Sequence, residues 1–153
     1  RSVTRRAHRS ILPYAEDCRA IVNLTLPRES VFARISPIEI EQALVNALRN
    51  SIESSNRGAT VSLTLGQRDK KALLETVDNG RGIPEGEVEH LFNPFYSRRT
   101  NVGGTGLGLS VAHGIAKAHA GEIEVESVVG SGTRLVISIP IIDANVLPGQ
   151  PLS

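Results

Sequence analysis

One segment, from about residue 37 to residue 54, constrains the fold most strongly because its apolar residues recur at helical spacing. Such a stripe predicts an amphipathic helix that buries one face against another layer. Ser36 supplies an N-cap, Pro37 the first helical position and Glu39 the acid of a capping box. The stripe consists of Ile40, Ala43, Leu44, Ala47, Leu48, Ser51 and Ile52. A fold for this chain must therefore cover one side of this helix.

Strand and helix patterns alternate around this segment. Apolar runs and alternations predict strands over residues 20–26, 31–35, 60–65, 72–77, 122–128 and 133–139. A short helix is expected over residues 84–91 and a longer one over residues 106–119, closed by Gly121. Helices between strand pairs predict an α/β two-layer sandwich, with a mixed β-sheet of about five strands packed on about three helices.

Length, charge and hydropathy limit the class of protein. The 153 residues suffice for one ordinary domain, and the net charge of +1 gives no overall field to hold nucleic acid or an anionic membrane. The most apolar stretch, residues 135–142, is far shorter than the ~20 residues of a membrane helix. Cys18 has no partner for an internal disulfide, which fits a reducing compartment. We therefore expect a cytoplasmic domain with no nucleic-acid partner and no direct membrane contact.

The two ends of the chain differ in pattern from its middle. The chain opens with Arg rather than Met, and its first residues are charged and weakly patterned. We expect residues 1–12 to be the remnant of an upstream linker, residues 13–142 the folded domain and residues 143–153 a loose C-terminal tail. Residues 93–105, rich in Gly, Arg and Asn, are a candidate lid. The sequence thus predicts one folded unit cut from a longer protein.

A carboxylate stands at the end of a predicted strand, where Asp78 begins the sequence Asp-Asn-Gly-Arg-Gly-Ile. The two glycines let the backbone approach a flat ligand closely. A buried carboxylate there can accept a hydrogen bond from an amine such as adenine N6. Taken alone, the common Asp-Asn-Gly turn explains the same residues without a ligand.

A glycine-rich stretch, residues 103–110, opens the second long predicted helix. The unpaired N–H groups and the dipole of a helix N-terminus favour an anion such as phosphate. The stretch lacks the Gly-Lys-Ser/Thr ending of a Walker loop and the spacing of a dinucleotide-binding fingerprint. A flexible linker is the alternative interpretation.

Two amides, Asn46 and Asn50, lie four residues apart and so project from one face of the first long helix. Amide oxygen suits the hard cation Mg²⁺, which also takes phosphate oxygens. A solvated helix edge is the alternative for this pair. Because the amides, the carboxylate and the glycine-rich stretch occur together and in order, they favour a nucleotide site.

Taken in order, these elements resemble the GHKL family of ATP-binding domains, which have the Bergerat-type fold, and most closely the catalytic domain of sensor histidine kinases. Residues 44–52 look like the N box of that family, residues 78–83 the G1 box, residues 91–96 the F box and residues 103–110 the G2 box. The ending, residues 121–140, is similar to the closing strands of histidine kinases, which gyrase-type relatives usually lack.

The resemblance implies a role for each matching residue. Asn50 would hold Mg²⁺ and Asn46 would support the phosphates, while Asp78 would read adenine N6 and Thr133 would assist it through water. Phe95 would anchor the lid by packing under it. The full set implied to bind ATP is Asp78, Gly80, Gly82, Ile83, Phe95, Gly104, Thr105, Gly106, Leu107, Gly108 and Thr133.

The sequence departs from the family pattern at two places. Ser51 stands where the family usually has Ala, and we expect this change to be harmless. Arg98 or Arg99 stands near a common lid lysine. Either arginine can neutralise a γ-phosphate with its bidentate fork, and the sequence does not choose between them. The lid, residues 95–104, is short, as in the nitrogen-sensing type of histidine kinase.

The function that the resemblance implies is donation of the γ-phosphate of Mg-ATP to a histidine on a separate phosphoacceptor domain of the same protein. A response regulator receiver domain would act downstream, and the full-length protein would be a homodimer, with its membrane anchoring left open. None of the four histidines, His8, His90, His113 and His119, has the sequence context of the acceptor. A GHKL-type ATPase is an alternative that calls for a glutamate at position 46, where Asn46 is a poor base. An anti-sigma serine kinase and a degenerate nucleotide-binding scaffold are the other alternative functions.

Overall fold

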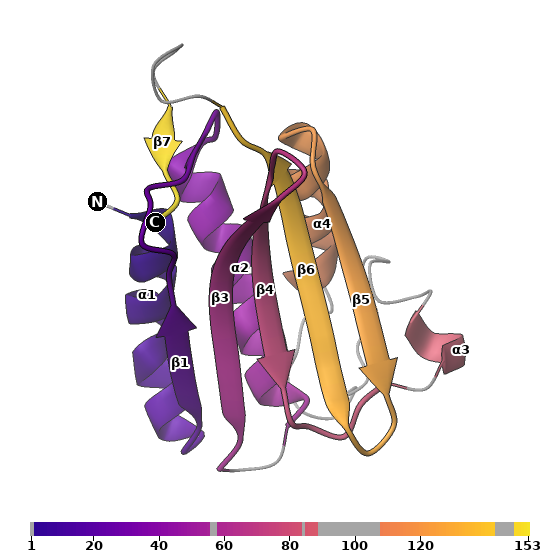
Figure 1. The fold of residues 1–153 in the computed structure, drawn as a ribbon. Helices are drawn as coiled ribbons and strands as arrows, with labels where there is room; N and C mark the ends of the chain where they lie inside the picture. The colour runs from indigo at the N-terminus through magenta and orange to yellow at the C-terminus, as the bar shows by residue number, and fades with distance from the viewer. Residues whose placement is uncertain (1, 56–57, 84, 89–107, 143–148) are drawn as a thin grey trace.

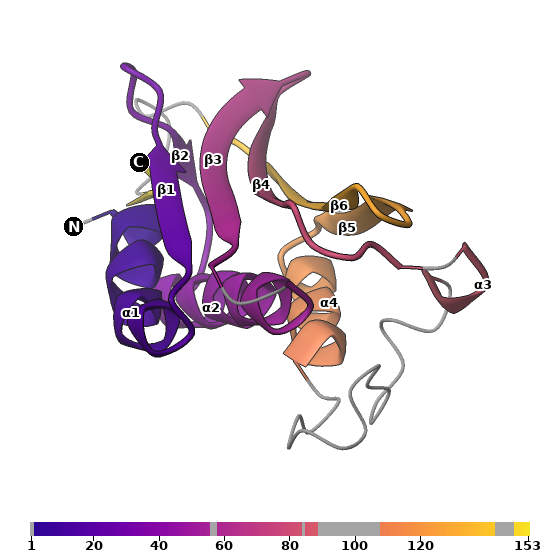
Figure 2. The ribbon, with the colours of Figure 1, turned by 90° about the horizontal axis from the view of Figure 1, so that it is seen from below.

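Two layers make up the described part of the chain, which in this computed structural model comprises residues 2–55, 58–83, 85–88, 108–142 and 149–153. A five-stranded sheet has the strand order β1-β3-β4-β6-β5 (Figure 1). Helices α1, α2 and α4 lie side by side on one face of it, and the other face is open (Figure 2). The elements are α1 Val3–Asp17, β1 Ile21–Thr25, β2 Phe32–Ala33, α2 Pro37–Glu53, β3 Thr60–Arg68, β4 Lys71–Asp78, α3 Glu85–Val88, α4 Gly108–Ala118, β5 Glu122–Val128, β6 Gly132–Pro140 and β7 Gln150–Pro151. The expected α/β two-layer sandwich is confirmed.

The sheet is mixed and has β4 at its centre. β1 pairs with β3 in parallel, whereas β4 pairs antiparallel with both β3 and β6. The register places Asp78 opposite Val61 and Val77 opposite Arg134. The end of β4 therefore lies between the start of β3 and the start of β6.

The core lies between the sheet and the helices. All seven residues of the predicted stripe on α2 are buried, and Ser36 Oγ accepts the N-capping hydrogen bond from Glu39 N at 3.4 Å. Alternate residues of β3 and β4 are buried beneath that stripe, including Leu63 and Leu74. No helix within the described ranges has both the length and the apolar character needed to cross a membrane.

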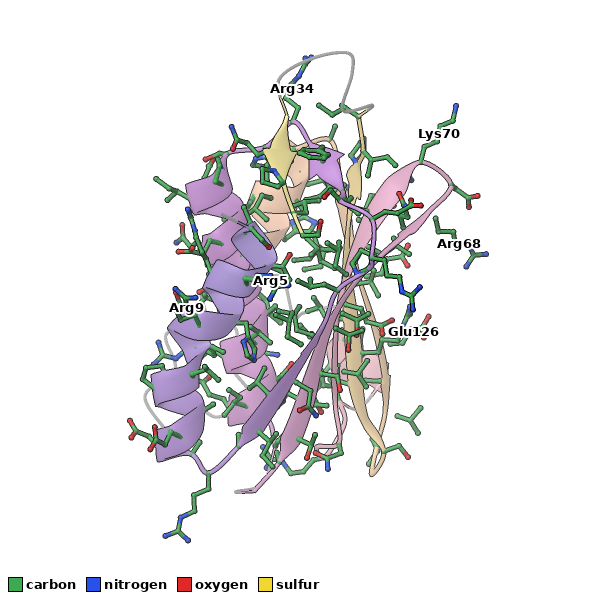
Figure 3. All side chains as sticks on the ribbon, turned by 60° about the vertical axis from the view of Figure 1, so that its left-hand side comes forward. Arg5, Arg9, Arg34, Arg68, Lys70 and Glu126 are labelled. Carbon is green, nitrogen blue, oxygen red and sulfur yellow. The ribbon has the colours of Figure 1, made fainter. Side chains whose placement is uncertain are left out.

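The open face of the sheet carries ion pairs. Arg134 on β6 forms ion pairs with Glu75 on β4 and, at 3.6 Å, with Glu126 on the edge strand β5. Figure 3 labels Glu126 on this face, and shows Arg5 and Arg9 on α1 far from Arg68 and Lys70 at the β3–β4 turn. The alternating glutamates of β5 discourage edge-to-edge pairing with another sheet.

The expected limits of the folded domain are wrong. The boundary at residue 12 falls inside α1, which buries Val3, Ala7, Ile11 and Ala15 in the core. These residues recur at every fourth position among charged residues. The apolar stripe is therefore narrow, and the sequence pattern alone does not predict this helix. The end of the chain is not loose in its described residues 149–153, because β7 pairs with β2 and Leu152 is fully buried. Leu152 N donates to Val31 O at 2.8 Å, and Ser2 Oγ donates to Leu152 O at 3.0 Å.

Helix α4 ends differently from its prediction. Ala120, rather than Gly121, adopts the positive φ, at 58°. Gly121 N donates to Ala116 O at 2.8 Å and Ala120 N donates to Lys117 O at 3.1 Å. This pair of hydrogen bonds is the Schellman motif, which places the left-handed residue one position earlier.

His119 ties the end of α4 to the start of α2. Its Nε2 accepts a hydrogen bond from Ser36 N at 3.0 Å, and its Nδ1 lies 2.7 Å from Ile115 O. Both contacts are satisfied only by a neutral ring that carries its proton on Nδ1.

Replacing this ring tests the contact. His119→Ala leaves the Ser36 N–H without its acceptor, so we expect the free energy of unfolding to fall by about 1–2 kcal/mol in urea titrations. Lys117→Ala, an exposed change on the same helix, is the control. Equal stability of the two variants would contradict this role of His119.

Candidate functional site

A buried carboxylate stands at the end of the central strand. Asp78 is only 4% exposed, and its Oδ1 accepts hydrogen bonds from Gly80 N at 2.9 Å and from Thr133 N at 3.2 Å. Gly80 follows on the chain, whereas Thr133 comes from the neighbouring strand β6. The carboxyl group is therefore held in one orientation by two elements.

The ionisation of this group is set by opposing effects. Burial raises the pKa of the Asp78 carboxyl, while hydrogen bonds from the Gly80 and Thr133 N–H groups, and to a smaller extent the Ser51 hydroxyl, oppose the rise. Both backbone hydrogen bonds go to Oδ1, and within hydrogen-bond distance no other donor to the carboxyl occurs among the described residues. A buried, oriented acceptor with a perturbed pKa is typical of a ligand-binding group.

The backbone after Asp78 packs tightly against the β5–β6 hairpin. Gly82 has φ +76°, and a Cβ atom added there would lie 2.2 Å from Val128 O. At Gly80 an added Cβ would lie 2.7 Å from Ser55 Oγ. Ile83 is 2% exposed, and its N–H donates to Ser127 Oγ at 2.6 Å. This stretch therefore presents backbone next to the Asp78 carboxyl.

A hydroxyl pair joins that stretch to β6. Ser127 Oγ lies 2.9 Å from Thr133 Oγ1 and 3.1 Å from Gly132 O. Thr133 was predicted from the sequence and is 8% exposed, but Ser127 was missed. The available signal was a polar residue at an inward position of β5, in line with Ile123 and Val125.

Ser51 is a buried polar residue on α2. It lies in the apolar stripe of that helix and is 4% exposed. Its hydroxyl has the smallest of the effects that oppose the rise in the pKa of the Asp78 carboxyl. The expectation that this departure from the family pattern is harmless stays a prediction.

Helix α2 also carries both predicted amides. Asn46 and Asn50 are half-buried, and neither side chain is hydrogen-bonded to another described residue. Asn50 lies in the last turn of α2, the end of the helix whose following residues Ser54 and Ser55 lie close to Gly80. No group of three His, Cys, Asp or Glu side chains that could hold a metal ion occurs in the described ranges.

The predicted residues differ in what the structure reports of them. It brings Asp78, Gly80, Gly82, Ile83 and Thr133 together at the ends of β4 and β6. Gly108 is the first residue of α4, whose N-terminal end points toward the same end of the sheet as the C-terminal end of α2 (Figure 1). Outside the described residues lie Phe95, Arg98, Arg99, Gly104, Thr105, Gly106 and Leu107.

The raised pKa of Asp78 makes a prediction about stability. The folded protein resists ionisation of this carboxyl, so the contribution of Asp78 to stability is full at low pH and is lost as pH rises through the raised folded pKa. Asp78→Asn keeps an oxygen for both backbone donors and does not titrate. We expect the free energy of unfolding of Asp78→Asn, measured in urea, to exceed that of the wild type by an amount that grows with pH and reaches about 1 kcal/mol at neutral pH. A variant less stable than the wild type at every pH would contradict this.

Comparison with known proteins identifies the family that this chain matches. Residues 35–143 match the family model described as histidine kinase-, DNA gyrase B- and HSP90-like ATPase. Sporulation kinase D of Bacillus subtilis (strain 168) is 35% identical over 116 residues, which are 76% of this chain and 22% of that protein. The alginate biosynthesis sensor protein KinB of Pseudomonas aeruginosa is 30% identical over 135 residues, with 88% and 23% covered. The chain thus spans about a fifth of the length of the curated relatives it matches.

Solved structures give the same result. The catalytic domain of histidine kinase ThkA superposes with a TM-score of 0.79 at 25% identity, covering 90% of each chain. The mycobacterial sensor histidine kinase MprB, at 24% identity, has a TM-score of 0.79 over 97% of this chain and 95% of that one, which shows the shared fold. The expected Bergerat-type fold is confirmed. Because the family model matches most of the length of this chain, the chain belongs to the histidine kinase-, DNA gyrase B- and HSP90-like ATPase family.

Proposed function

We propose that this chain is the ATP-binding catalytic domain of a two-component sensor histidine kinase. The observation that carries the proposal is the buried Asp78 carboxylate, whose Oδ1 is fixed by Gly80 and Thr133 while its second oxygen accepts no hydrogen bond from another described residue. The matched curated relatives named above are a sporulation kinase and a sensor protein, and the ThkA match is a histidine kinase catalytic domain.

The described residues fit an adenine base. The exocyclic amine of adenine is a donor, and Asp78 offers an oriented acceptor. Gly80 and Gly82 carry no side chain, so this backbone packs closely on Ser55 and on Val128. The proposal places a flat ring against the stretch from Gly80 to Ile83. The Thr133 hydroxyl, held by Ser127, stands beside the carboxyl and can hold a water. These groups distinguish an amine-bearing base from one that presents a carbonyl at that position.

The phosphates and the metal ion belong to the other end of the proposed site. Asn50 would hold Mg²⁺ and Asn46 would support the phosphates, because both amides have no partner among the described residues. The glycine-rich residues Gly104 to Gly108, which end at the start of α4, would cradle the phosphates. Arg98 or Arg99 would neutralise the γ-phosphate and Phe95 would anchor the lid, as proposals on residues outside the described ranges.

The chemistry asks the protein mainly for positioning and charge neutralisation. Bound ATP supplies a phosphoryl group that passes to a nucleophile with little covalent help from the protein. A hydrolase of this family would need a general base near position 46, and the amide of Asn46 cannot take a proton. The phosphoacceptor histidine, the receiver domain, the homodimer and a cytoplasmic location are parts of the same proposal.

Calorimetric titration of the chain with ATP, with and without Mg²⁺, tests the pocket. Asp78→Ala loses a hydrogen bond to a charged group, so its affinity should fall by about ten- to a hundredfold, or ~1.5–3 kcal/mol. Asp17→Ala, an exposed carboxylate at the end of α1, is the control and should match the wild type. Equal ATP affinity in both variants would overturn the assignment of Asp78 to adenine.

A further inference from the structure

A chain of hydrogen bonds runs through the Ser127 hydroxyl beside the proposed base pocket. Ser127 on β5 lies directly opposite Thr133 on β6, and the two strands run side by side (Figure 1). Ile83 N donates to Ser127 Oγ at 2.6 Å. Ser127 Oγ also lies 2.9 Å from Thr133 Oγ1 and 3.1 Å from Gly132 O. Ser127 therefore joins the backbone after Asp78 to the residue whose N–H holds the Asp78 carboxyl at 3.2 Å.

The protons in this chain of hydrogen bonds can be counted. A hydroxyl has one proton to donate and two positions that accept. The Ile83 N–H takes one accepting position of Ser127, whose own proton goes to one of its two other neighbours. Thr133 Oγ1 is the nearer of them, at a distance closer to the usual O–H···O value of about 2.7–2.8 Å. If Thr133 Oγ1 accepts the Ser127 proton, the proton of Thr133 is left for the pocket.

We propose that Ser127 is a positioning residue for nucleotide recognition, which donates its proton to Thr133 Oγ1 and leaves the Thr133 hydroxyl as a donor toward the base. This inference rests on the proposed function and names a further residue of the same site. Thr133 is 8% exposed, so its proton must find an acceptor inside the pocket. A water that accepts this proton keeps two of its own, one for the Asp78 carboxylate and one for a ring nitrogen of the base.

This direction of donation selects among purine bases. Adenine has an amine that donates at C6 and a ring nitrogen, N1, that accepts beside it, whereas guanine and hypoxanthine have a carbonyl at C6 and a proton on N1. An acceptor at Asp78 and a donor at Thr133 match adenine at both positions and oppose the other two bases at both. With the Ser127 proton on Gly132 O instead, the Thr133 proton would go to Ser127 Oγ and Thr133 would offer the pocket an acceptor only.

Nucleotide binding by the chain and its variants tests the position of the Ser127 proton. Calorimetry would compare ATP with 1-deaza-ATP, in which a C–H group replaces the N1 acceptor. Ser127→Ala should bind ATP about fivefold more weakly than the wild type, because a neutral hydrogen bond is lost, and 1-deaza-ATP within about twofold of it. Thr133→Val should show the same selective loss. Adding Ser127→Ala to Thr133→Val should then leave the ratio of the two affinities unchanged.

Two further variants separate the hydroxyl from the packing around it. Ser127→Thr keeps a hydroxyl at this position and should restore the wild-type ratio of affinities for ATP and 1-deaza-ATP. Ser138→Ala, a serine of β6 on the open face of the sheet, is the control and should bind both nucleotides as the wild type does.

Three results would overturn the proposal. The first is an equal loss of affinity for both nucleotides in Ser127→Ala, which would assign Ser127 a merely structural role. The second is an unchanged ATP affinity in that variant, and the third is a further selective loss when Ser127→Ala is added to Thr133→Val. Failure of the wild type to bind either nucleotide would instead remove the proposed function, and the role of Ser127 with it, so the two failures are distinguishable.

Discussion

The hydrogen bonding of one buried carboxylate, Asp78, is the constraint on which the rest of the site depends. A carboxylate removed from water is costly unless donors surround it. Here the N–H donors come from the following turn and from β6, through Gly80 and Thr133. The pairing of β4 with β6 must be correct for these donors to meet. The order of the strands in the sheet therefore determines the orientation of this one side chain.

The residues around Asp78 include features that lower the stability of the folded state. Burial raises the pKa of Asp78, so an ionised carboxyl there weakens the folded state. Gly82 has a left-handed backbone conformation and leaves no room for a side chain beside Val128. Elsewhere, the N-cap of α2, the alternating strands and the ion pairs on the open face follow ordinary rules. A local departure of this kind is expected at a binding site.

Most of the architecture could be predicted because it is encoded in local periodicity. The stripe and capping box of α2, the strand alternation and the Asp78 turn are each visible within a few residues. Helix α1 was missed because its buried positions are small or spaced among charges, and β7 because its pairing with β2 joins residues far apart in the sequence. Ser127 was missed for a related reason, since its partner Thr133 lies on another strand and spacing in the sequence does not reveal the pair.

The measurement that tests the central claim most directly is phosphoryl transfer from ATP. The chain, joined to the phosphoacceptor domain proposed for the longer protein, would be incubated with γ-labelled ATP and Mg²⁺. We predict label on a histidine of the acceptor domain, with the acid lability of phosphohistidine, and its loss in Asp78→Ala. Binding of ATP that yields only free phosphate, or no label on histidine at all, would contradict the account of this chain as a phosphodonor domain.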